Sequence, residues 1–381
     1  MLCPKMTRTS DKKWIITDMR ILLLGEYSNV HATLAKGLRA LGNEVTVASN
    51  GDFWKDYPRD IDLSRKPGKL GGISLYMKAQ RIIPKLQGYD IVQLINPIFL
   101  ELKAERLFSF YNQLRRNNSK IVLGGFGMDW FWVNTCIKDK PLRYSDFNIG
   151  DELRTNSEAL MEREDWLGTA KERLNRQIAQ ECDGIVAGLY EYWACYHPVY
   201  PKKTVFIPYP IEMPAKPNIA PVGDKIKLFI GINTSRNAYK GTDLMLSAAE
   251  EVLARHPDRM ELRVARSVPF HKYQSMMDGA DAILDQLYSY TPSMNPLLAM
   301  SKGIVCIGGG EPENYEILGE STLRPIVNVG PSRESVVDAL EHLVTHPEEL
   351  YKKKKDSVEY IKRYHEYHTV ARKYEEFYKS L

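Results

Sequence analysis

The stretch MRILLLGEYSNVHATLAKGLRALGNEV, residues 19–45, contains a strand, a loop, a helix and the start of a second strand. Residues 21–24 are wholly apolar, as expected of a strand buried on both faces of a parallel sheet. Apolar residues then recur at helical spacing over residues 30–41, and Gly42 is placed to end the helix. The next strand begins at Val45, so the segment is a βαβ unit and predicts a parallel sheet.

The same alternation continues along the chain, but a proline-rich segment interrupts it. Five prolines lie between positions 208 and 221. Because proline lacks an amide donor and its neighbours avoid the helical region, this segment cannot sustain regular structure. We therefore expect one doubly wound half before it and a second one after it. Predicted strands before it occupy residues 90–95, 120–127, 183–188 and 204–209, with helices over 100–114 and 151–182; predicted strands after it occupy 225–232, 262–267, 282–287 and 304–310, with helices over 243–256 and 296–302.

The predicted fold class is α/β, with two doubly wound, Rossmann-like domains that face a central cleft. The N-terminal domain is expected over residues 19–209, the linker over 210–224 and the C-terminal domain over 225–355. Residues 356–381 are expected to form a C-terminal helix that packs back on the N-terminal domain. Residues 1–18 carry charge but no apolar core of signal-peptide length, so a disordered extension or a misassigned start is expected there.

The composition of the 381 residues, 44% hydrophobic and 26% charged, is that of a soluble globular protein. The net charge of +4 is too small to indicate a nucleic-acid partner. Five scattered cysteines and the lack of any apolar run near the roughly 20 residues of a membrane span predict a cytoplasmic protein, at most peripheral to the inner face of the membrane. The lysine run at 352–355 is interpreted as a solvated helix face, with a membrane-surface contact as the alternative.

Five positions in the first half are candidates for a catalytic or acceptor-binding role. Gly25 and Asn29 lie in the loop after the first strand, where ligands bind in doubly wound sheets; a plain tight turn is the alternative. The loop lacks the G-x-G-x-x-G fingerprint, so no nicotinamide cofactor is indicated. His31 and Asp129 are the catalytic candidates, with packing or helix capping as the alternatives. Trp130 offers an apolar face for stacking on a sugar ring, and core packing is its alternative.

The second half contains a pattern suited to a diphosphate. Arg236 and the pair Lys240-Gly241 follow the first strand of this half and precede a helix. A planar guanidinium, a compact ammonium and the amides of the helix N-terminus can therefore converge on one anion. Two solvent-facing basic residues in a loop are the alternative.

A second anion site is predicted at a later helix N-terminus. Ser293 or Asn295 can cap this helix, and the free amides of its first turn, around Met294, can bind an anion. Three glycines at 308–310 then let the backbone approach a ligand, and the Glu313 carboxylate can accept hydrogen bonds from sugar hydroxyls. A surface loop without function is the alternative for this turn.

In this order the motifs resemble those of the retaining GT-B glycosyltransferases, in particular glycosyltransferase family four. Members open with a strand, a glycine-bearing loop and a helix that ends in G-H-E-V, which here is GNEV with Asn43 in place of the histidine. Their basic pair before K-G corresponds to Arg236 and Lys240-Gly241, one residue tighter than usual. Their E-A-M-A-x-G helix and glycine-rich turn correspond to LLAMSKGIVCIGGGEPE. The resemblance covers the chain from Met19 to the C-terminus.

The resemblance implies transfer of a sugar, with retained configuration, from a nucleotide-diphosphate-sugar to a glycan, glycolipid or small-molecule acceptor in cell-surface polysaccharide assembly. It assigns the donor to the second half and the acceptor to the first. Arg236, Lys240 and the helix amides from Ser293 to Asn295 would stabilise charge on the leaving diphosphate. Neither a cofactor nor a metal is expected, because positive side chains and a helix dipole replace the metal in this fold type.

One departure from the family concerns two glutamates, eight positions apart, that bracket the donor sugar and ribose. Alignment on Ala299-Met300 places Tyr290 and Leu298 at these positions. Glu313 is then the expected substitute in donor recognition, with a different donor or lost activity as the alternatives. The competing functions are a sugar-nucleotide epimerase of the same fold and a catalytically inactive protein that binds a partner or a glycan.

Overall fold

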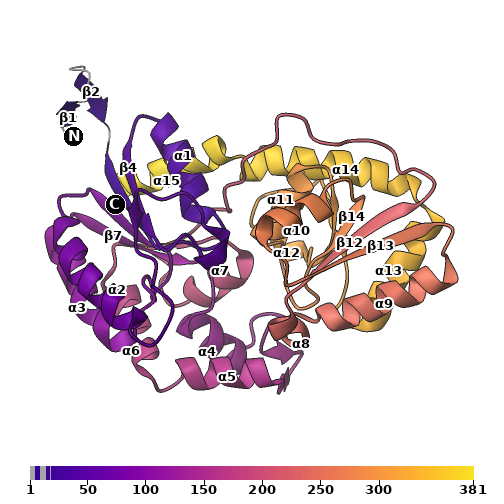
Figure 1. The fold of residues 1–381 in the computed structure, drawn as a ribbon, viewed down its shortest axis with the longest axis horizontal. Helices are drawn as coiled ribbons and strands as arrows, with labels where there is room; N and C mark the ends of the chain where they lie inside the picture. Colours follow the sequence, from indigo (N-terminus) through magenta and orange to yellow (C-terminus); the bar gives the residue numbers. More distant parts are fainter. Residues whose placement is uncertain (1–4, 9–13, 18) are drawn as a thin grey trace.

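The chain forms two α/β domains that lie side by side, as seen in a computed structural model that describes residues 5–8, 14–17 and 19–381 (Figure 1). Each domain is built on its own parallel sheet with helices on both faces. The predicted α/β class with two doubly wound halves is therefore confirmed.

The N-terminal domain contains a seven-stranded parallel sheet with strand order β11-β10-β7-β6-β3-β4-β5. Its strands are β3 Arg20–Leu24, β4 Glu44–Ser49, β5 Ile61–Asp62, β6 Ile91–Leu94, β7 Lys120–Gly125, β10 Gly184–Ala187 and β11 Thr204–Phe206. Strand β3 is buried on both faces, because Leu22 and Leu24 belong to one core cluster and Ile21 and Leu23 to the other. The predicted βαβ unit is confirmed by the parallel register of β3 with β4, in which Ile21 lies opposite Val45.

The helices of this domain are α1 Val30–Ala40, α2 Gly71–Ile82, α3 Ala104–Asn117, α4 Trp130–Lys138, α5 Ser157–Trp166, α6 Ala170–Glu181 and α7 Tyr190–Tyr196. The prediction of one long helical stretch over 151–182 is wrong. A hairpin of β8 Asn148–Ile149 and β9 Glu152–Leu153 precedes α5. Gly168, with φ of +72°, then separates α5 from α6, because glycine adopts this left-handed conformation without strain.

The C-terminal domain contains a five-stranded parallel sheet with strand order β13-β12-β14-β15-β16. Its strands are β12 Ile226–Ile232, β13 Met260–Arg266, β14 Ala282–Leu284, β15 Val305–Gly308 and β16 Val327–Asn328. Its helices are α8 Asn237–Lys240, α9 Thr242–Arg255, α10 Phe270–Met277, α11 Met294–Ser301, α12 Pro312–Glu316, α13 Arg333–Thr345 and α14 Glu348–Tyr360. Strand β14 is shorter than the predicted 282–287, which leaves Asp285 at its carboxyl end rather than inside the sheet.

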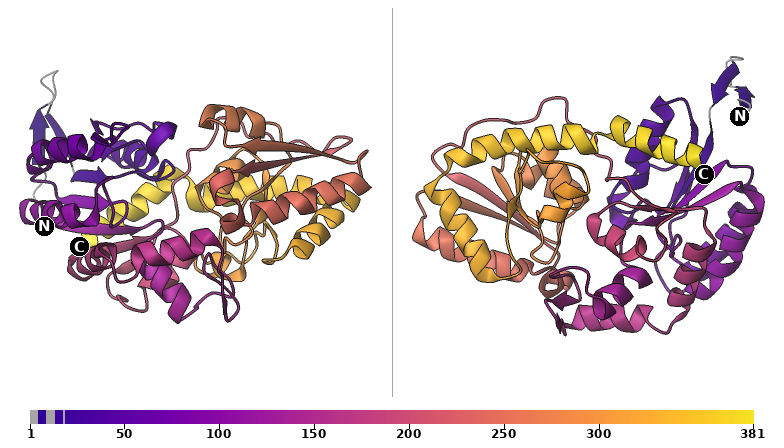
Figure 2. Two further views of the ribbon diagram at one scale, coloured as in Figure 1. Left: turned by 60° about the horizontal axis from the view of Figure 1, so that its bottom comes forward. Right: turned by 180° about the vertical axis from the view of Figure 1, so that it is seen from behind.

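The chain crosses between the domains twice, and the two crossings run side by side. The amide of Ile211 in the first crossing donates to the His365 carbonyl at 2.6 Å, and the Tyr367 amide donates to the Ile211 carbonyl at 3.1 Å. The second crossing consists of α14, a π-helical turn Ile361–His365 and α15 Tyr367–Ser380. Helix α15 lies on the N-terminal domain (Figure 2), in such close contact with α1 that a Cβ added to Gly37 would lie 2.6 Å from that of Ala371.

Part of the predicted N-terminal extension lies within the described residues. Strands β1 Lys5–Arg8 and β2 Trp14–Thr17 pair in antiparallel fashion. The rest of the expected extension, residues 1–4, 9–13 and 18, lies outside the described residues. Among the helices described from residue 19 onward, none is long and apolar enough to cross a membrane.

Candidate active site

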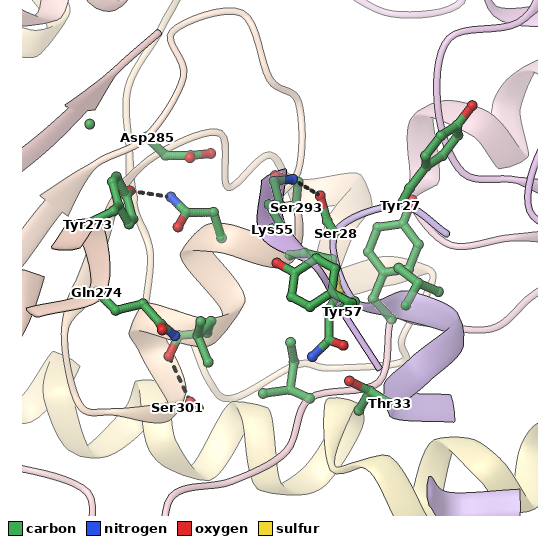
Figure 3. A pocket seen from close by; sticks show the side chains of 18 of the residues that line it. Tyr27, Ser28, Thr33, Lys55, Tyr57, Tyr273, Gln274, Asp285, Ser293 and Ser301 are labelled. Atoms are coloured by element: carbon green, nitrogen blue, oxygen red, sulfur yellow. Dashed lines mark hydrogen bonds between the residues drawn. The ribbon is translucent and has the colours of Figure 1, made fainter. Parts of the chain in front are cut away.

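A cleft of about 1070 Å³ lies between the two domains. Its walls come from the carboxyl ends of β3 and β4 in the N-terminal domain and of β12 and β14 in the C-terminal domain. Doubly wound sheets bind their ligands at this edge. Figure 3 shows side chains from both walls around the cleft, with Tyr273 and Asp285 on one side and Tyr27, Lys55 and Tyr57 on the other.

Lys240 and Asp285 place opposite charges on the C-terminal wall. Lys240 ends α8 and Asp285 directly follows β14, and both line the cleft. Burial raises the pKa of the Asp285 carboxyl to about 6, although the charge of Lys240 opposes this shift. Burial also lowers the pKa of the Lys240 ammonium, and the charge of Asp285 opposes that shift. A cation in such poorly solvated surroundings binds a phosphate oxygen more strongly than a cation in open water does.

The N-terminus of α11 opens into the same part of the cleft. Ser293 is its N-cap residue, but the Ser293 side chain makes no capping hydrogen bond. The first-turn amides of a helix have no intrahelical acceptor, so those of Met294 and Asn295 are available to an anion. All three residues line the cleft, and the Asn295 amide group donates to the Tyr273 hydroxyl at 2.8 Å. The C-terminal wall thus combines the ammonium groups of Lys240 and Lys302, the Asp285 carboxylate, helix amides and neutral hydrogen-bonding groups.

Two loops form most of the N-terminal wall, one after β3 and one after β4. They contain five of the seven non-glycine residues with positive φ in the described chain: Ser28, Asn29, Asp52, Phe53 and Asp56, with φ between 50° and 73°. Such conformations cost energy and persist only where their surroundings hold them. The Asp52 carboxylate holds the two loops together, because it accepts hydrogen bonds from the Ser28 amide at 2.8 Å and from the Lys55 ammonium at 2.6 Å.

Glu191 of α7 joins the N-terminal domain to the loop that leads into α11. Its carboxylate accepts hydrogen bonds from the amides of Tyr290 and Thr291, at 3.0 and 2.8 Å, and from the Thr291 hydroxyl at 2.5 Å. Burial raises the pKa of Glu191 to about 7, although these hydrogen bonds oppose the shift. The N-terminal domain therefore holds the loop that leads into α11, the helix whose first-turn amides face the cleft.

The structure does not support a catalytic contact of His31. The His31 side chain is fully buried, with Nδ1 2.8 Å from the Gly25 carbonyl oxygen and Nε2 3.1 Å from Nε2 of Gln93. Burial lowers its pKa to about 3, so the ring is neutral. Gly25 is buried too, and a Cβ there would lie 2.2 Å from Cγ2 of Ile95, so it makes the tight turn that was the alternative. Of the loop candidates, Asn29 lines the cleft.

Asp129 and Trp130 also lie away from the cleft. Asp129 is fully buried as the N-cap of α4, where it accepts hydrogen bonds from the Trp132 amide at 2.9 Å and the Tyr196 hydroxyl at 2.6 Å. Trp130 packs within the N-terminal domain, with the Arg176 guanidinium 5.1 Å from its ring centre. Both residues therefore have the capping and packing roles that were their alternatives.

The structure places the two basic residues of the predicted motif in different surroundings. Lys240 lines the cleft, but Arg236 does not. The Arg236 guanidinium instead stacks on the Tyr239 ring, 4.8 Å from the ring centre. Gly241 has φ of +68° and lies against Leu287, where an added Cβ would come within 2.6 Å. Gly241 thus allows the sharp turn between α8 and α9 that brings Lys240 to the cleft.

Glu313, the expected substitute for the missing glutamates, does not line the cleft in this structure. Its carboxylate accepts hydrogen bonds from the Arg143 guanidinium at 2.7 and 3.0 Å and from the Tyr290 hydroxyl at 3.0 Å. Arg143 belongs to the N-terminal domain, so Glu313 takes part in a contact between the domains. At the two family glutamate positions, Tyr290 is buried and bonded to Glu313, while Leu298 presents an apolar side chain to the cleft.

Sequence reasoning missed several residues that line the cleft: Trp54, Lys55, Tyr57, Tyr273 and Asp285. Asp285 had a usable signal, because it is the first polar residue after the apolar run AIL and could have been taken as the end of the strand that was predicted to continue to residue 287. The loop residues after β4 had none, since the loop follows an ordinary strand and lacks a motif.

The amino-acid sequence matches no family model and no curated protein. Solved structures do resemble it. A sucrose-phosphate synthase from Thermosynechococcus elongatus has a TM-score of 0.61 at 13% identity, over 95% of this chain and 98% of that one. Anabaena HepE, in complex with UDP-glucose, has a TM-score of 0.59 at 11% identity, over 95% and 100%. A putative UDP-N-acetylglucosamine 2-epimerase from Listeria monocytogenes has a TM-score of 0.53 at 12% identity, over 94% and 95%. The chain has the GT-B fold.

Proposed function

We propose that the protein is a glycosyltransferase that moves a sugar from a nucleotide-diphosphate-sugar to an acceptor. The observation that carries this proposal is the C-terminal wall of the cleft, where the Lys240 ammonium and the open N-terminus of α11 offer positive charge to one anion. In transfer, the bond from the anomeric carbon to the diphosphate breaks, and charge grows on the leaving oxygen. Groups fixed in advance at that point lower the barrier.

The N-terminal wall suits a sugar-bearing acceptor. The exposed ring of Trp54, the half-buried ring of Tyr27 and the buried ring of Tyr57 line the cleft and offer apolar faces. Lys55 with Ser28 offers polar contacts. The proposal includes a glycan or glycolipid acceptor and retained configuration at the transferred sugar. It also includes a role in cell-surface polysaccharide assembly in the cytoplasm. No metal is required in this scheme, because Lys240 and the helix amides supply the positive charge; turnover should therefore be unchanged by a chelator.

The decisive experiment offers the pure protein a panel of nucleoside diphosphates and their sugars. Binding is measured as a rise in melting temperature, since a ligand that binds only the folded state stabilises it. Release of nucleoside diphosphate is then measured with and without candidate acceptors. Acceptor-dependent release that is lost in Lys240→Ala supports transfer; binding without release under any condition contradicts it and favours the inactive binding protein.

A sugar-nucleotide epimerase is the second candidate, because the GT-B fold of this chain also occurs in the putative epimerase described above. Asp285 and Glu212 are carboxylates on the cleft wall that could move a proton. Incubation with the sugar nucleotide alone separates the two functions. A new sugar nucleotide formed without acceptor would favour epimerisation.

A further inference from the structure

Helix α2 carries a line of apolar side chains on its solvent face. Leu70, the residue before the helix, and Ile73 and Met77 within it are 73%, 62% and 50% exposed. Their spacing of three and four residues places them on one side of a helix. Leu75 and Ala79 fill the opposite side and are buried against the domain. The helix is therefore packed on its inner face and apolar on its outer face as well.

This concentration of exposed apolar residues is unusual within the protein. Ten large apolar side chains are exposed in the described part of the chain, and five of them lie between residues 53 and 77. The other two of these five are Phe53 and Trp54, in the loop after β4, at 60% and 62% exposure. Grouped exposed apolar surface marks an interaction site, whereas single residues do not.

Positive charge surrounds the same helix. Residues 63–89 contain six cations and no aspartate or glutamate. These cations are Arg65, Lys66, Lys69, Lys78, Arg81 and Lys85. Lys78 forms an ion pair with Asp62. The other five cations, Arg65, Lys66, Lys69, Arg81 and Lys85, are exposed. A partner for this surface therefore has an apolar interior and a negative boundary.

A chain of ion pairs connects α2 to the loop that bears Phe53 and Trp54. Asp56 pairs with Arg59 at 2.7 Å, Arg59 pairs with Asp62 at 2.8 Å, and Asp62 pairs with Lys78 of α2 at 3.1 Å. Trp54 itself lines the cleft. Ion-paired residues thus connect α2, with its exposed apolar side chains, to the loop on the acceptor side of the cleft.

We propose that α2 and the loop after β4 form a docking surface for a bilayer that contains anionic lipids. An interfacial helix buries its apolar side chains at the boundary of the headgroups and the acyl chains, and its cations attract anionic headgroups. Docking in this way places the acceptor side of the cleft beside the membrane, where a lipid-linked acceptor would lie. Membrane binding does not depend on the proposed sugar transfer, so the two can fail separately.

The lysine run at 352–355, the earlier candidate for membrane contact, is engaged within the protein. The Lys354 ammonium is buried in an ion pair with Asp281 at 2.5 Å. Lys352 pairs with Asp356 at 2.5 Å, and Lys353 donates to the Arg324 carbonyl at 3.1 Å. This run therefore offers less free charge than α2 does.

The test is co-sedimentation of the full chain with vesicles of phosphatidylglycerol and phosphatidylcholine, and with phosphatidylcholine alone. The double variant Ile73→Ser/Met77→Ser should weaken binding to the anionic vesicles about ten-fold or more, since each side chain loses apolar burial. The matched control is Leu160→Ser/Met161→Ser on α5, whose residues are also exposed but lie among Glu158, Glu162 and Glu164. The control should bind like the wild type.

Charge provides the second arm of the test. Lys66→Ala and Lys69→Ala should each weaken binding about five-fold, and added salt should reduce the difference. Both positions are exposed, so melting temperatures should stay unchanged and confirm folding. Wild-type binding that is equal on neutral vesicles, or unaffected by the α2 variants, would overturn the proposal. So would a concentration-dependent dimer that Ile73→Ser/Met77→Ser abolishes, because a second copy would then cover this surface.

Discussion

The two walls of the cleft are built in different ways. On the C-terminal wall, Lys240, Asp285 and Ser293 sit where a helix or strand begins or ends. On the N-terminal wall, Ser28 and Asp52 belong to loops in left-handed backbone conformations. The first wall carries charge and free amides, whereas the second carries aromatic rings on strained loops.

This difference indicates how the two substrates would be recognised. All nucleotide-diphosphate-sugars share the diphosphate, so a rigid site at element ends can serve it. Acceptors differ in shape, and loops can change without disturbing the sheet. We therefore expect changes on the C-terminal wall to affect turnover with every acceptor, and changes on the N-terminal wall to affect the choice of acceptor.

The largest effect is expected at Lys240. Lys240→Ala should lower turnover roughly 100-fold, because it removes a fixed charge at the leaving diphosphate. Arg236→Ala is the matched control, four residues upstream, and should cost only a few-fold, since Arg236 stacks on Tyr239. Both are measured as steady-state rates at saturating donor. Equal losses in the two variants would mean that both cations bind the donor, although only Lys240 lines the cleft in the structure.

The next effect concerns stability and depends on Glu191. The pKa of Glu191 in the folded state, about 7, is above its ordinary 4.5, so the folded protein binds this proton more tightly than the unfolded chain. The stability from this group is thus complete below about pH 4.5 and falls as the pH rises through 7, by roughly 3 kcal/mol in all.

Glu191→Gln removes this titration while keeping the size of the side chain. The loss of unfolding free energy between pH 5 and pH 8 should therefore be smaller in the variant than in the wild type. Chemical denaturation at several pH values measures the difference. Parallel curves for the two proteins would show that the Glu191 carboxylate does not titrate in this range.

A smaller effect is expected at Trp54 on the N-terminal wall. Trp54→Ala should raise the KM for the acceptor about five-fold, the equivalent of about 1 kcal/mol of lost stacking, and leave donor affinity unchanged. Measured with a water-soluble acceptor and no membrane, Phe53→Ala, at the neighbouring and similarly exposed ring, serves as the control, because Phe53 does not line the cleft. A change in donor affinity with Trp54→Ala would break the assignment of the two walls.

The smallest effect is expected at Glu313. Glu313→Gln should change donor affinity less than two-fold in calorimetry, because its carboxylate bonds Arg143 and Tyr290 outside the cleft. The Arg143 side chain is 56% exposed, so solvent weakens this pair and the melting temperature should fall only slightly. A large loss of donor affinity would mean that Glu313 rearranges towards the donor when it binds.

Local sequence patterns were sufficient for the fold. The apolar run from Ile21 to Leu24, the helical spacing after it and the prolines between positions 208 and 221 each reflect an interaction between near neighbours in the chain. The same holds for Lys240 and for Ser293 to Asn295, which are placed by the strand or helix that they adjoin. The break at Gly168 was missed because a single glycine is tolerated in a helical pattern.

Burial across long distances in the chain decided the rest. His31 and Asp129 follow strands in the sequence, as many ligand-binding residues do. Gln93 and Tyr196 nevertheless complete their hydrogen bonds, and both side chains are buried away from the cleft. The Glu313 carboxylate is bound outside the cleft by Arg143, which lies 170 residues earlier in the chain. By itself, therefore, the sequence determined two doubly wound domains and the placement of Lys240 and of the N-terminus of α11 at one edge of the second sheet. Only the tertiary structure decided which polar side chains face the cleft, because a partner that neutralises or covers a polar group leaves no mark in the sequence beside it.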